Sequence, residues 1–423
     1  MALIRKIYLL LAFFALLFTS CDGFGELFGG GPDDDDSDGD EFVLPNIKPF
    51  RKGETVSRTL LVYIMAENDI SDCLTKDFFE IKEGAYALPD DVRLFVYFDN
   101  SDAERMPALY QFHPYEGRLV ENVVYAFEED VCSSDTTILG QVLDVIFDDY
   151  PTKEFDLIMG SHAGGWVTHQ AKSSASRWIG ADNEENSYLD KPSDTTIEIK
   201  ELVDLFDRLP VKIDRLMFDA CLMQGVEVAY ALRNVADWII ASPAEILADG
   251  APYDKMIPEF FNPSSGIEDI MYEYKKAYDN TDYAALLSAV QTSFMQNFAE
   301  VTRRYVEEYF SADYSNATYS GCLAYVPGKA PAYYDINSVM KKNLDEIDYK
   351  EWKAAFDEAV PYMMISNSRL LWSNIAYKAV PVDDSCGGLS AYFPRNMQQN
   401  AASNKDFKAT EWYKAAGWDV AGW

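Results

Sequence analysis

Residues 155–166, with the sequence FDLIMGSHAGGW, begin as an apolar run and end in a histidine within a glycine-rich turn. Residues 215–223, RLMFDACLM, repeat this plan and carry a cysteine at the same point. Short buried strands that stop abruptly at polar or glycine residues are typical of a parallel α/β sheet. Reactive side chains gather at the carboxyl ends of such strands. The two stretches therefore predict an α/β protein in which His162 and Cys221 meet at one edge of the sheet.

Strands and helices alternate on both sides of these two stretches. This alternation predicts a mostly parallel sheet that is covered by helices on both faces. The predicted strands are Thr59 to Ala66, Val92 to Phe98 and Trp238 to Ser242, with a hairpin of Leu109 to Phe112 and Leu119 to Tyr125 turning at Glu116-Gly117. The predicted helices are Ser71 to Leu88, Thr137 to Tyr150 with Asp135-Thr136 as its cap, and Ile199 to Leu209.

The chain after residue 266 has a different pattern, mainly helical and rich in tyrosine and phenylalanine. Two similar pieces, GCLAYVP at 321–327 and GLSAYFP at 388–394, interrupt it and predict two further strands. We expect this α+β part to extend and flank the sheet. The sequence contains no glycine-rich phosphate loop and no nucleotide-binding fingerprint.

The composition limits the class of protein and its partners. The chain has 423 residues, of which 48% are hydrophobic, and this is typical of a globular protein with a sizeable core. It carries 70 acidic and 36 basic residues, giving a formal net charge of −34. Such a surface repels nucleic acid and anionic membrane surfaces, so neither is expected as a partner.

The amino terminus is typical of an exported protein. Arg5 and Lys6 precede an apolar run, Ile7 to Phe18, which is followed by Thr19-Ser20-Cys21. This arrangement resembles a bacterial lipobox, in which Cys21 would be lipidated and would provide the only attachment to a membrane. The acidic run after it resembles the surface-export tag of Bacteroidetes lipoproteins and predicts an outer-membrane, surface-exposed location. An ordinary signal peptide cut nearby is the alternative.

These patterns divide the chain into four parts. We predict a lipoprotein signal peptide at 1–20, a flexible acidic tether at 21–56, a catalytic core at 57–265 and a C-terminal helical and strand subdomain at 266–423. The tether imitates the start of an EF-hand loop at Asp34, but Pro45 stands where the closing glutamate should be. No cluster of cysteine and histidine suggests zinc, so the sequence predicts no metal site.

Cys221 and His162 are the candidate reactive pair. A cysteine needs a local bias toward the thiolate to act as a nucleophile, and a histidine can supply it. We expect Cys221 to open a helix whose positive N-terminus lowers the thiol pKa. Backbone N–H groups of Ala163 and Gly164 could bind a developing oxyanion. The other cysteines, Cys73, Cys132, Cys322 and Cys386, allow three disulfide pairings or none.

The motifs SHAGGW at 161–166 and FDACLM at 218–223 are similar to those of the clostripain family of cysteine peptidases. The likeness extends from about Thr59 to the end of the chain and departs from the family at Ala163, where a glycine is usual. It implies the caspase-like fold, a three-layer α/β/α sandwich. It also implies that Cys221 is the nucleophile, that His162 is the base and acid, and that Asp219 supports the site.

The same resemblance implies a substrate class and a maturation step. An acidic residue after the strand that follows the nucleophile would select Arg or Lys before the cut, and Asp249, with Glu245 in reserve, occupies that loop. Self-cleavage would fall at Lys172, Arg177 or Lys191. No cofactor is required on sequence grounds, although the resemblance leaves room for calcium. The alternative function is a catalytically silent lipoprotein that binds peptides at the cell surface.

Overall fold

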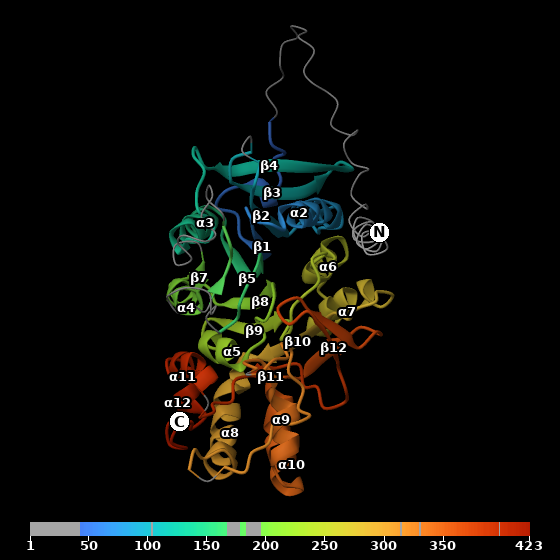
Figure 1. The fold of residues 1–423 in the computed structure, drawn as a ribbon. Helices are drawn as coiled ribbons and strands as arrows, with labels where there is room; N and C mark the ends of the chain where they lie inside the picture. Colours follow the sequence, from blue (N-terminus) through green and yellow to red (C-terminus); the bar gives the residue numbers. More distant parts are fainter. Residues whose placement is uncertain are drawn as a thin grey trace, which may run out of the picture. The chain divides into compact units, whose positions relative to one another are not determined.

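A nine-stranded sheet forms the centre of the compact unit Pro45–Trp423. The computed structural model describes residues 43–102, 105–166, 178–182, 196–313, 315–329, 331–396 and 398–423. The strand order is β12-β10-β9-β8-β5-β1-β2-β3-β4, and the five strands from β9 to β2 are parallel (Figure 1). The strands are β1 Val56–Ala66, β2 Val92–Asn100, β3 Ala108–Tyr115, β4 Arg118–Ala126, β5 Thr152–Gly160, β8 Ile213–Asp219, β9 Ala236–Ala241, β10 Leu286–Gln291 and β12 Tyr362–Ile365.

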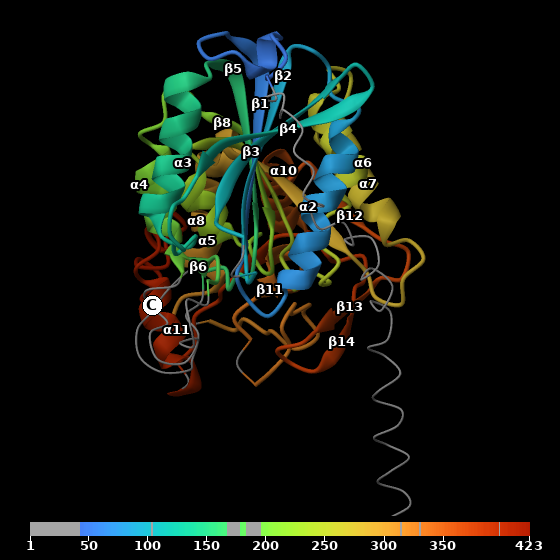
Figure 2. The same cartoon turned by 90° about the horizontal axis from the view of Figure 1, so that it is seen from above.

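Helices cover both faces of this sheet, so the predicted three-layer α/β/α fold is confirmed (Figures 1 and 2). One face carries α2 Ser71–Ala85, α6 Tyr253–Phe261 and α7 Ile267–Ala277, and the other carries α3 Thr136–Asp149, α4 Ile199–Phe206 and α5 Val226–Leu232. Each face has its own apolar core. Phe78 and Ile257 lie in the first core, and Leu143 and Leu202 lie in the second. A parallel sheet buried on both faces explains why its strands are continuous apolar runs rather than alternating ones.

The local sequence determines where helix α3 begins and which of its faces is buried. The side chain of Asp135 accepts a hydrogen bond from the backbone N–H of Thr137 and caps the first turn. Apolar residues spaced three and four apart then face the sheet. These buried residues are Leu139, Val142, Leu143 and Ile146. The position of the cap agrees with the prediction from sequence.

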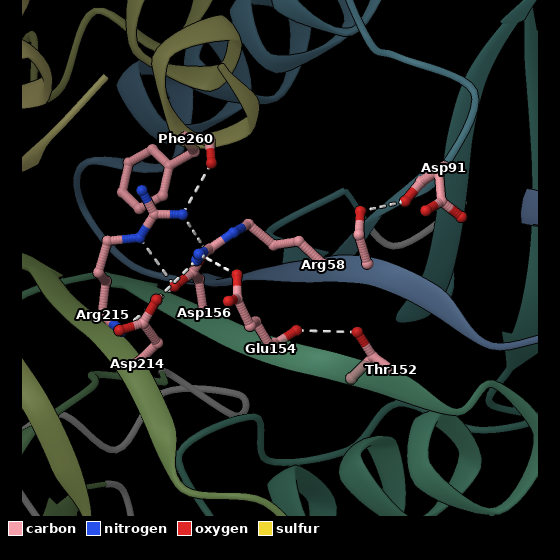
Figure 3. A network of polar contacts seen from close by, with 9 residues as sticks. Arg58, Asp91, Thr152, Glu154, Asp156, Asp214, Arg215 and Phe260 are labelled. Carbon is pink, nitrogen blue, oxygen red and sulfur yellow. Dashed lines mark hydrogen bonds and ion pairs between the residues drawn. The ribbon is translucent and has the colours of Figure 1, made fainter. Parts of the chain in front are cut away.

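A buried ion-pair network joins β5 to β8 (Figure 3). Asp156 is fully buried and accepts hydrogen bonds from the backbone N–H and from the Nε of Arg215, at 3.2 and 2.9 Å. Arg58 of β1 binds the same carboxylate at 2.7 Å and also reaches Asp214. The Arg215 guanidinium donates to the carbonyl of Phe260, which links α6 to the sheet. The network fixes the relative position of β5 and β8, the strands that precede His162 and Cys221.

The C-terminal part joins the same sheet through β10 and the edge strand β12, both antiparallel to their neighbours. The sequence did not predict these strands, because short apolar runs between helices cannot be distinguished from buried helix segments by pattern. Its helices are α8 Met295–Tyr309, α9 Ile336–Asn343, α10 Glu346–Ala359, α11 Ala401–Phe407 and α12 Glu411–Ala415. Among the described residues, no helix is long and apolar enough to cross a membrane.

The prediction of two strands at 321–327 and 388–394 is largely wrong. The first piece makes only an isolated bridge from Ala324 to Tyr334, and the second contributes the two-residue strand β15 Ser390–Ala391, paired with β11 Tyr334–Asp335. Both pieces end in proline, which cannot donate a ladder hydrogen bond. Both pieces nevertheless contribute buried residues to the core, and the pattern reflected this packing rather than strand pairing. These residues are Leu323 and Tyr325 of the first piece and Leu389, Ala391, Tyr392 and Phe393 of the second.

Candidate active site

The turns that carry His162 and Cys221 are in direct contact. Strands β5 and β8 are parallel neighbours with Gly160 opposite Asp219, so His162 and Cys221 each lie two residues beyond a paired position. A Cβ atom added to Gly165 would lie 2.4 Å from the carbonyl oxygen of Leu222. Only glycine allows this approach, and its φ of 61° is also one that glycine adopts readily. The structure thus brings the two turns together at the carboxyl edge of the sheet.

The Cys221 turn is an irregular loop held on several sides. Leu222 has a φ of 63°, and its N–H donates to the carbonyl of Ala244 at 2.9 Å. The N–H of Gln224 donates to Ser242 at 3.0 Å, and its carbonyl accepts from the N–H of Ser390 at 2.9 Å. Helix α5 begins only at Val226, so the expectation that Cys221 opens a helix is wrong. The loop instead continues alongside the end of β9, where its backbone finds hydrogen-bond partners.

The protonation state of Cys221 follows from this environment. Burial raises the pKa of the thiol to about 12, and the nearby carboxylates of Glu245 and Asp219 act in the same direction. The N–H of Ile246 donates to Sγ at 3.4 Å and partly opposes the shift. The expected lowering of the pKa is therefore wrong, because desolvation acts here without a helix N-terminus. With its pKa raised in this way, Cys221 is a neutral thiol near pH 7.

Asp69 holds the imidazole of His162. The Oδ1 atom of Asp69 lies 2.6 Å from Nε2 of His162. The carbonyl of His162 also accepts a hydrogen bond from the N–H of Gly180 at 2.9 Å, which fixes the backbone of the turn. No role for Asp69 was predicted from the sequence. An available signal was its position just after β1, because β1 is the neighbour of β5 in the sheet.

The turn after His162 is held at two successive residues, Ala163 and Gly164. Ala163 pairs with Ile179 in an antiparallel bridge, and the carbonyl of Gly164 accepts a hydrogen bond from the Tyr333 hydroxyl at 2.6 Å. Among the described non-glycine residues, positive φ angles occur at four positions, and Ala163 is not one of them. An alanine is therefore accommodated without strain at this departure from the family motif.

Asp219 ends β8, two residues before Cys221, and is almost fully buried. One of its oxygens accepts hydrogen bonds from the N–H of Ala251 and the hydroxyl of Tyr253, both at 3.0 Å. A Cβ at Gly250 would lie 3.0 Å from Asp219 and 3.2 Å from the buried carboxylate of Asp77. Burial raises the pKa of both aspartates. Two carboxyl groups thus flank Gly250 from inside the protein.

The two residues considered for substrate selection have different surroundings. The side chain of Asp249 is 76% exposed and lies 3.7 Å from the ammonium of Lys76. The carboxylate of Glu245 accepts hydrogen bonds from the N–H groups of Asn374 and Ile375, at 3.0 and 3.2 Å. These belong to the turn between β13 Leu370–Ser373 and β14 Lys378–Pro381. Asp249 is accessible from solvent, whereas Glu245 fastens this hairpin beside the Cys221 turn.

Four sequence-predicted residues lie outside the described part of the chain. They are the lipidation candidate Cys21 and the self-cleavage candidates Lys172, Arg177 and Lys191.

The three-layer fold, with a thiol and an imidazole on neighbouring strand ends, defines the caspase-like class of cysteine peptidases. Residues 62–423 match the model of the clostripain family, and the chain belongs to that family. It is 27% identical over 237 residues to clostripain of Hathewaya histolytica, a match that covers 48% of this chain and 42% of clostripain. The chain therefore spans less than half the length of this relative.

Two solved structures are similar over most of the chain. One is a secreted C11 cysteine protease from Bacteroides thetaiotaomicron in complex with an irreversible peptide inhibitor, with a TM-score of 0.73, 26% identity and coverage of 86% of this chain and 100% of that one. The other is an inactive zymogen of a C11 protease from Parabacteroides distasonis, with a TM-score of 0.71, 25% identity and coverage of 88% and 99%.

Proposed function

We propose that the chain is an exported cysteine endopeptidase in which Cys221 is the nucleophile and His162 is the general base and acid. The contact between their two turns at the ends of β5 and β8 is the observation that carries this proposal. A neutral thiol beside an imidazole can be activated by proton transfer at the moment of attack. The burial that raises the pKa of Cys221 makes this transfer necessary.

The proposed reaction proceeds through a thioester. His162 takes the proton from Sγ as the sulfur attacks the peptide carbonyl, and backbone N–H groups of the Ala163–Gly164 turn stabilise the oxyanion. His162 then gives the proton to the leaving amine, and water hydrolyses the thioester. Asp69 acts as a positioning residue, because accepting the Nε2 proton leaves Nδ1 as the basic nitrogen.

Substitution of the pair tests this function. Cys221→Ala and His162→Ala should each abolish hydrolysis of a peptide library, since each removes a group that acts in the transition state. Cys322→Ala is the control, because this half-buried thiol lies outside the site and its loss should leave the rate unchanged. Circular dichroism should show all three variants folded. Substantial hydrolysis by Cys221→Ala would disprove the proposal.

We further propose that the enzyme cuts after Arg or Lys. Support comes from the carboxyl groups around Gly250, where Asp249 is exposed and where Asp219 and Asp77, whose pKa values are raised by burial, lie close behind. A carboxylate in such a pocket can pair with a guanidinium or an ammonium group. The cleavage rates of peptides with Arg, Lys, Gln or Leu before the scissile bond distinguish a preference for basic residues from a broad specificity.

Asp249→Ala should remove the preference for Arg and Lys while leaving the cleavage of a Gln substrate near its original rate. Asp254→Ala is the matched control, because this carboxylate lies on α6 and pairs with Lys255. Equal cleavage of Leu and Arg peptides by the wild-type protein would contradict the proposed specificity. An unchanged preference in Asp249→Ala would exclude Asp249 as its source.

A second candidate function is a catalytically silent module that binds peptides. The raised pKa of Cys221 favours it, because a thiol that stays protonated is a poor nucleophile. A peptidyl chloromethyl ketone ending in Arg discriminates between the two functions. Rapid labelling of Cys221 that is lost in His162→Ala indicates an enzyme, whereas peptide binding without labelling indicates the silent module.

Maturation and anchoring belong to the same proposal. We infer self-cleavage after Lys172, Arg177 or Lys191, so the wild-type protein should yield two fragments and Cys221→Ala a single chain. Equal nicking of both proteins would instead indicate an external protease. We also infer lipidation of Cys21 and a location on the outer membrane, facing the cell surface. Metabolic labelling with palmitate should mark the wild type and not Cys21→Ser.

A further inference from the structure

The turn of the β13–β14 hairpin exposes two large apolar side chains beside the Cys221 turn. This turn consists of residues 374–377, Asn-Ile-Ala-Tyr, and the hairpin lies at the carboxyl edge of the sheet (Figure 2). Ile375 is 58% exposed and Tyr377 is 85% exposed. Single exposed apolar residues are common on protein surfaces, but two of them within one tight turn form a small patch. Ile375 and Tyr377 together are the tip patch.

The hairpin that carries the tip patch is fixed to the protein at its base. Leu371 is buried in the core, and the ring of Trp372 packs against the ring of Tyr283 with their centroids 5.1 Å apart. The carbonyl of Leu370 also accepts a hydrogen bond from the N–H of Ala284 at 2.8 Å. The tip patch is therefore held in place before a ligand arrives, and this lowers the entropic cost of binding.

Glu245 places the tip patch close to the sulfur of Cys221. Its carboxylate accepts hydrogen bonds from the N–H groups of Asn374 and Ile375, at 3.0 and 3.2 Å. The next residue, Ile246, donates its N–H to Sγ of Cys221 at 3.4 Å. One side chain and one peptide unit thus connect the hairpin to the contact with the sulfur. Since an extended peptide advances about 3.3 Å per residue, the tip patch is within reach of residues about two to four positions from a bond held over Cys221.

The backbone of Tyr377 adopts a conformation that is unfavourable for a tyrosine. Its φ is 47°, in the left-handed region, where glycine or asparagine is accommodated more easily. Backbone strain of this kind is concentrated at functional sites, where it is part of how a ligand is held. The ring gains little burial in exchange, because it is among the most exposed large side chains of the described residues. The tyrosine at this position therefore points to a contact with a ligand rather than with the core.

The order of the strands decides which part of a peptide the tip patch can contact. Strand β8, which ends just before Cys221, lies between β5 and β9. His162 follows β5 and, in the proposed reaction, gives its proton to the leaving amine, so the residues after the scissile bond lie on that side. Glu245 follows β9, on the opposite side of Cys221. The tip patch is therefore on the side of the residues that precede the scissile bond.

We propose that the tip patch binds an apolar side chain, such as that of leucine, about two to four residues before the scissile bond. This inference rests on the proposed function and adds a second determinant of specificity to the basic residue at the cut. An aliphatic side chain binds through the apolar area that it removes from water. A tyrosine ring beside an isoleucine offers such area on a rigid surface, so little side-chain entropy is lost.

Peptide binding to the full-length Cys221→Ala protein tests the tip patch without hydrolysis. The probes are a fluorescein-labelled peptide, Gly-Gly-Gly-Arg-Ala-Ala, and three versions in which leucine replaces one of the glycines. Fluorescence anisotropy should show that at least one leucine version binds about fivefold or more tightly than the glycine peptide, because partial burial of a leucine side chain supplies this gain. Equal affinity of all four peptides would overturn the proposal.

Tyr377→Asn, made in the Cys221→Ala protein, is the decisive variant. Asparagine tolerates the left-handed backbone, so this change removes the ring and keeps the hairpin folded. The gain from leucine should fall below about twofold, and Ile375→Ser should reduce it as well. Ile347→Ser is the matched control, because this isoleucine of α10 is also exposed, at 78%, and the gain should persist. A full gain in Tyr377→Asn, or its loss in Ile347→Ser, would overturn the assignment to the tip patch.

The same peptides separate this inference from the proposed catalysis. Hydrolysis of the best-bound leucine version by the protein with Cys221 intact, at a rate that Tyr377→Asn lowers, supports both proposals. If that protein hydrolyses none of the peptides while the gain in binding is present and is lost in Tyr377→Asn, the proposed catalysis fails and the tip patch stands as a peptide-binding surface.

Discussion

The Oδ1 atom of Asp69 lies 2.6 Å from the Nε2 atom of His162, although the two residues are 93 positions apart. The contact arises from the sheet, because β1 and β5 are parallel neighbours whose carboxyl ends lie side by side. The Asp69 side chain is 78% exposed, so solvent weakens the interaction. In the proposed site its value is orientation, since a carboxylate that accepts the Nε2 proton favours the tautomer of His162 that is protonated there.

Replacing Asp69 with Asn should lower kcat by about two- to fivefold, the range expected of an exposed charged contact. The KM should change little, because Asp69 acts through His162 rather than on the substrate. The pH profile of kcat should also shift, which a merely structural change would not cause. A KM increase with unchanged kcat would instead place Asp69 in substrate binding.

Gly165→Ala should impair the active site more than any other glycine change in this turn. The added methyl group would meet the carbonyl oxygen of Leu222 at 2.4 Å, so the two reactive turns must separate. A displacement of about 1 Å can reduce turnover by about a hundredfold. The rate of peptide cleavage measures the effect.

Gly117→Ala provides the control for this substitution. Gly117 also has a positive φ, 76°, but a Cβ there would have no atom within 4 Å. Gly117→Ala therefore has the same backbone strain as Gly165→Ala, but the added methyl group meets no neighbouring atom. Equal activity of the two alanine variants would mean that the contact between Gly165 and Leu222 does not position the site.

Asp156→Asn should destabilise the fold by about 3–5 kcal/mol, because the buried Arg215 would lose its charged partner. Chemical denaturation measures this as a lower free energy of unfolding. Asp214→Asn is the control, since Asp214 is partly exposed and pairs with Arg58 at 2.9 Å. It should cost less than about 1 kcal/mol. A similar decrease in the free energy of unfolding in both variants would contradict a special role for the buried pair of Asp156 and Arg215.

The raised pKa of Cys221 predicts an unusual pH dependence of alkylation in His162→Ala. Only the thiolate reacts, so the rate at Cys221 should increase about tenfold for each pH unit through pH 10. Because burial raises the pKa of the Cys221 thiol in the folded protein to about 12, the alkylation rate should not level off up to pH 10. The same residue in the unfolded protein should level off near its ordinary pKa. Mass spectrometry after iodoacetamide treatment measures the alkylation of Cys221 in the folded and in the unfolded protein. A rate that levels off below pH 9 in the folded protein would contradict a pKa raised by burial of this thiol.

The sequence predicted the parallel sheet and the strand ends well, because apolar runs that stop at His162 and Cys221 have few other structural explanations. It could not predict β10 and β12, which resemble helix segments in composition. It placed Cys221 on a helix N-terminus, since FDACLM reads as a strand that runs directly into a helix. The left-handed Leu222 and the loop before Val226 depend on contacts with Ala244 and Ser242, which only the fold creates.

The contact between Asp69 and His162 could not be predicted from the sequence for a different reason. Acidic residues are so common in this chain that no single one stands out. Their significance comes from the pairing of β1 with β2 and β5, which collects side chains from separate segments at one edge. Pairing partners are long-range properties, and local patterns do not encode them.

The hydrogen bond between Ser390 and the carbonyl of Gln224 affects the order in which the Cys221 loop is assembled during synthesis. These residues lie 166 positions apart, and Tyr392 adds a second hydrogen bond to Glu227 at 2.8 Å. A ribosome therefore releases the Cys221 segment well before it makes the residues that hold it in place. The nascent polypeptide carries Cys221 in a loop that lacks these two hydrogen bonds until residues 390–392 have been translated. On the proposed function, this order of synthesis delays proteolysis until that later segment has folded against the loop.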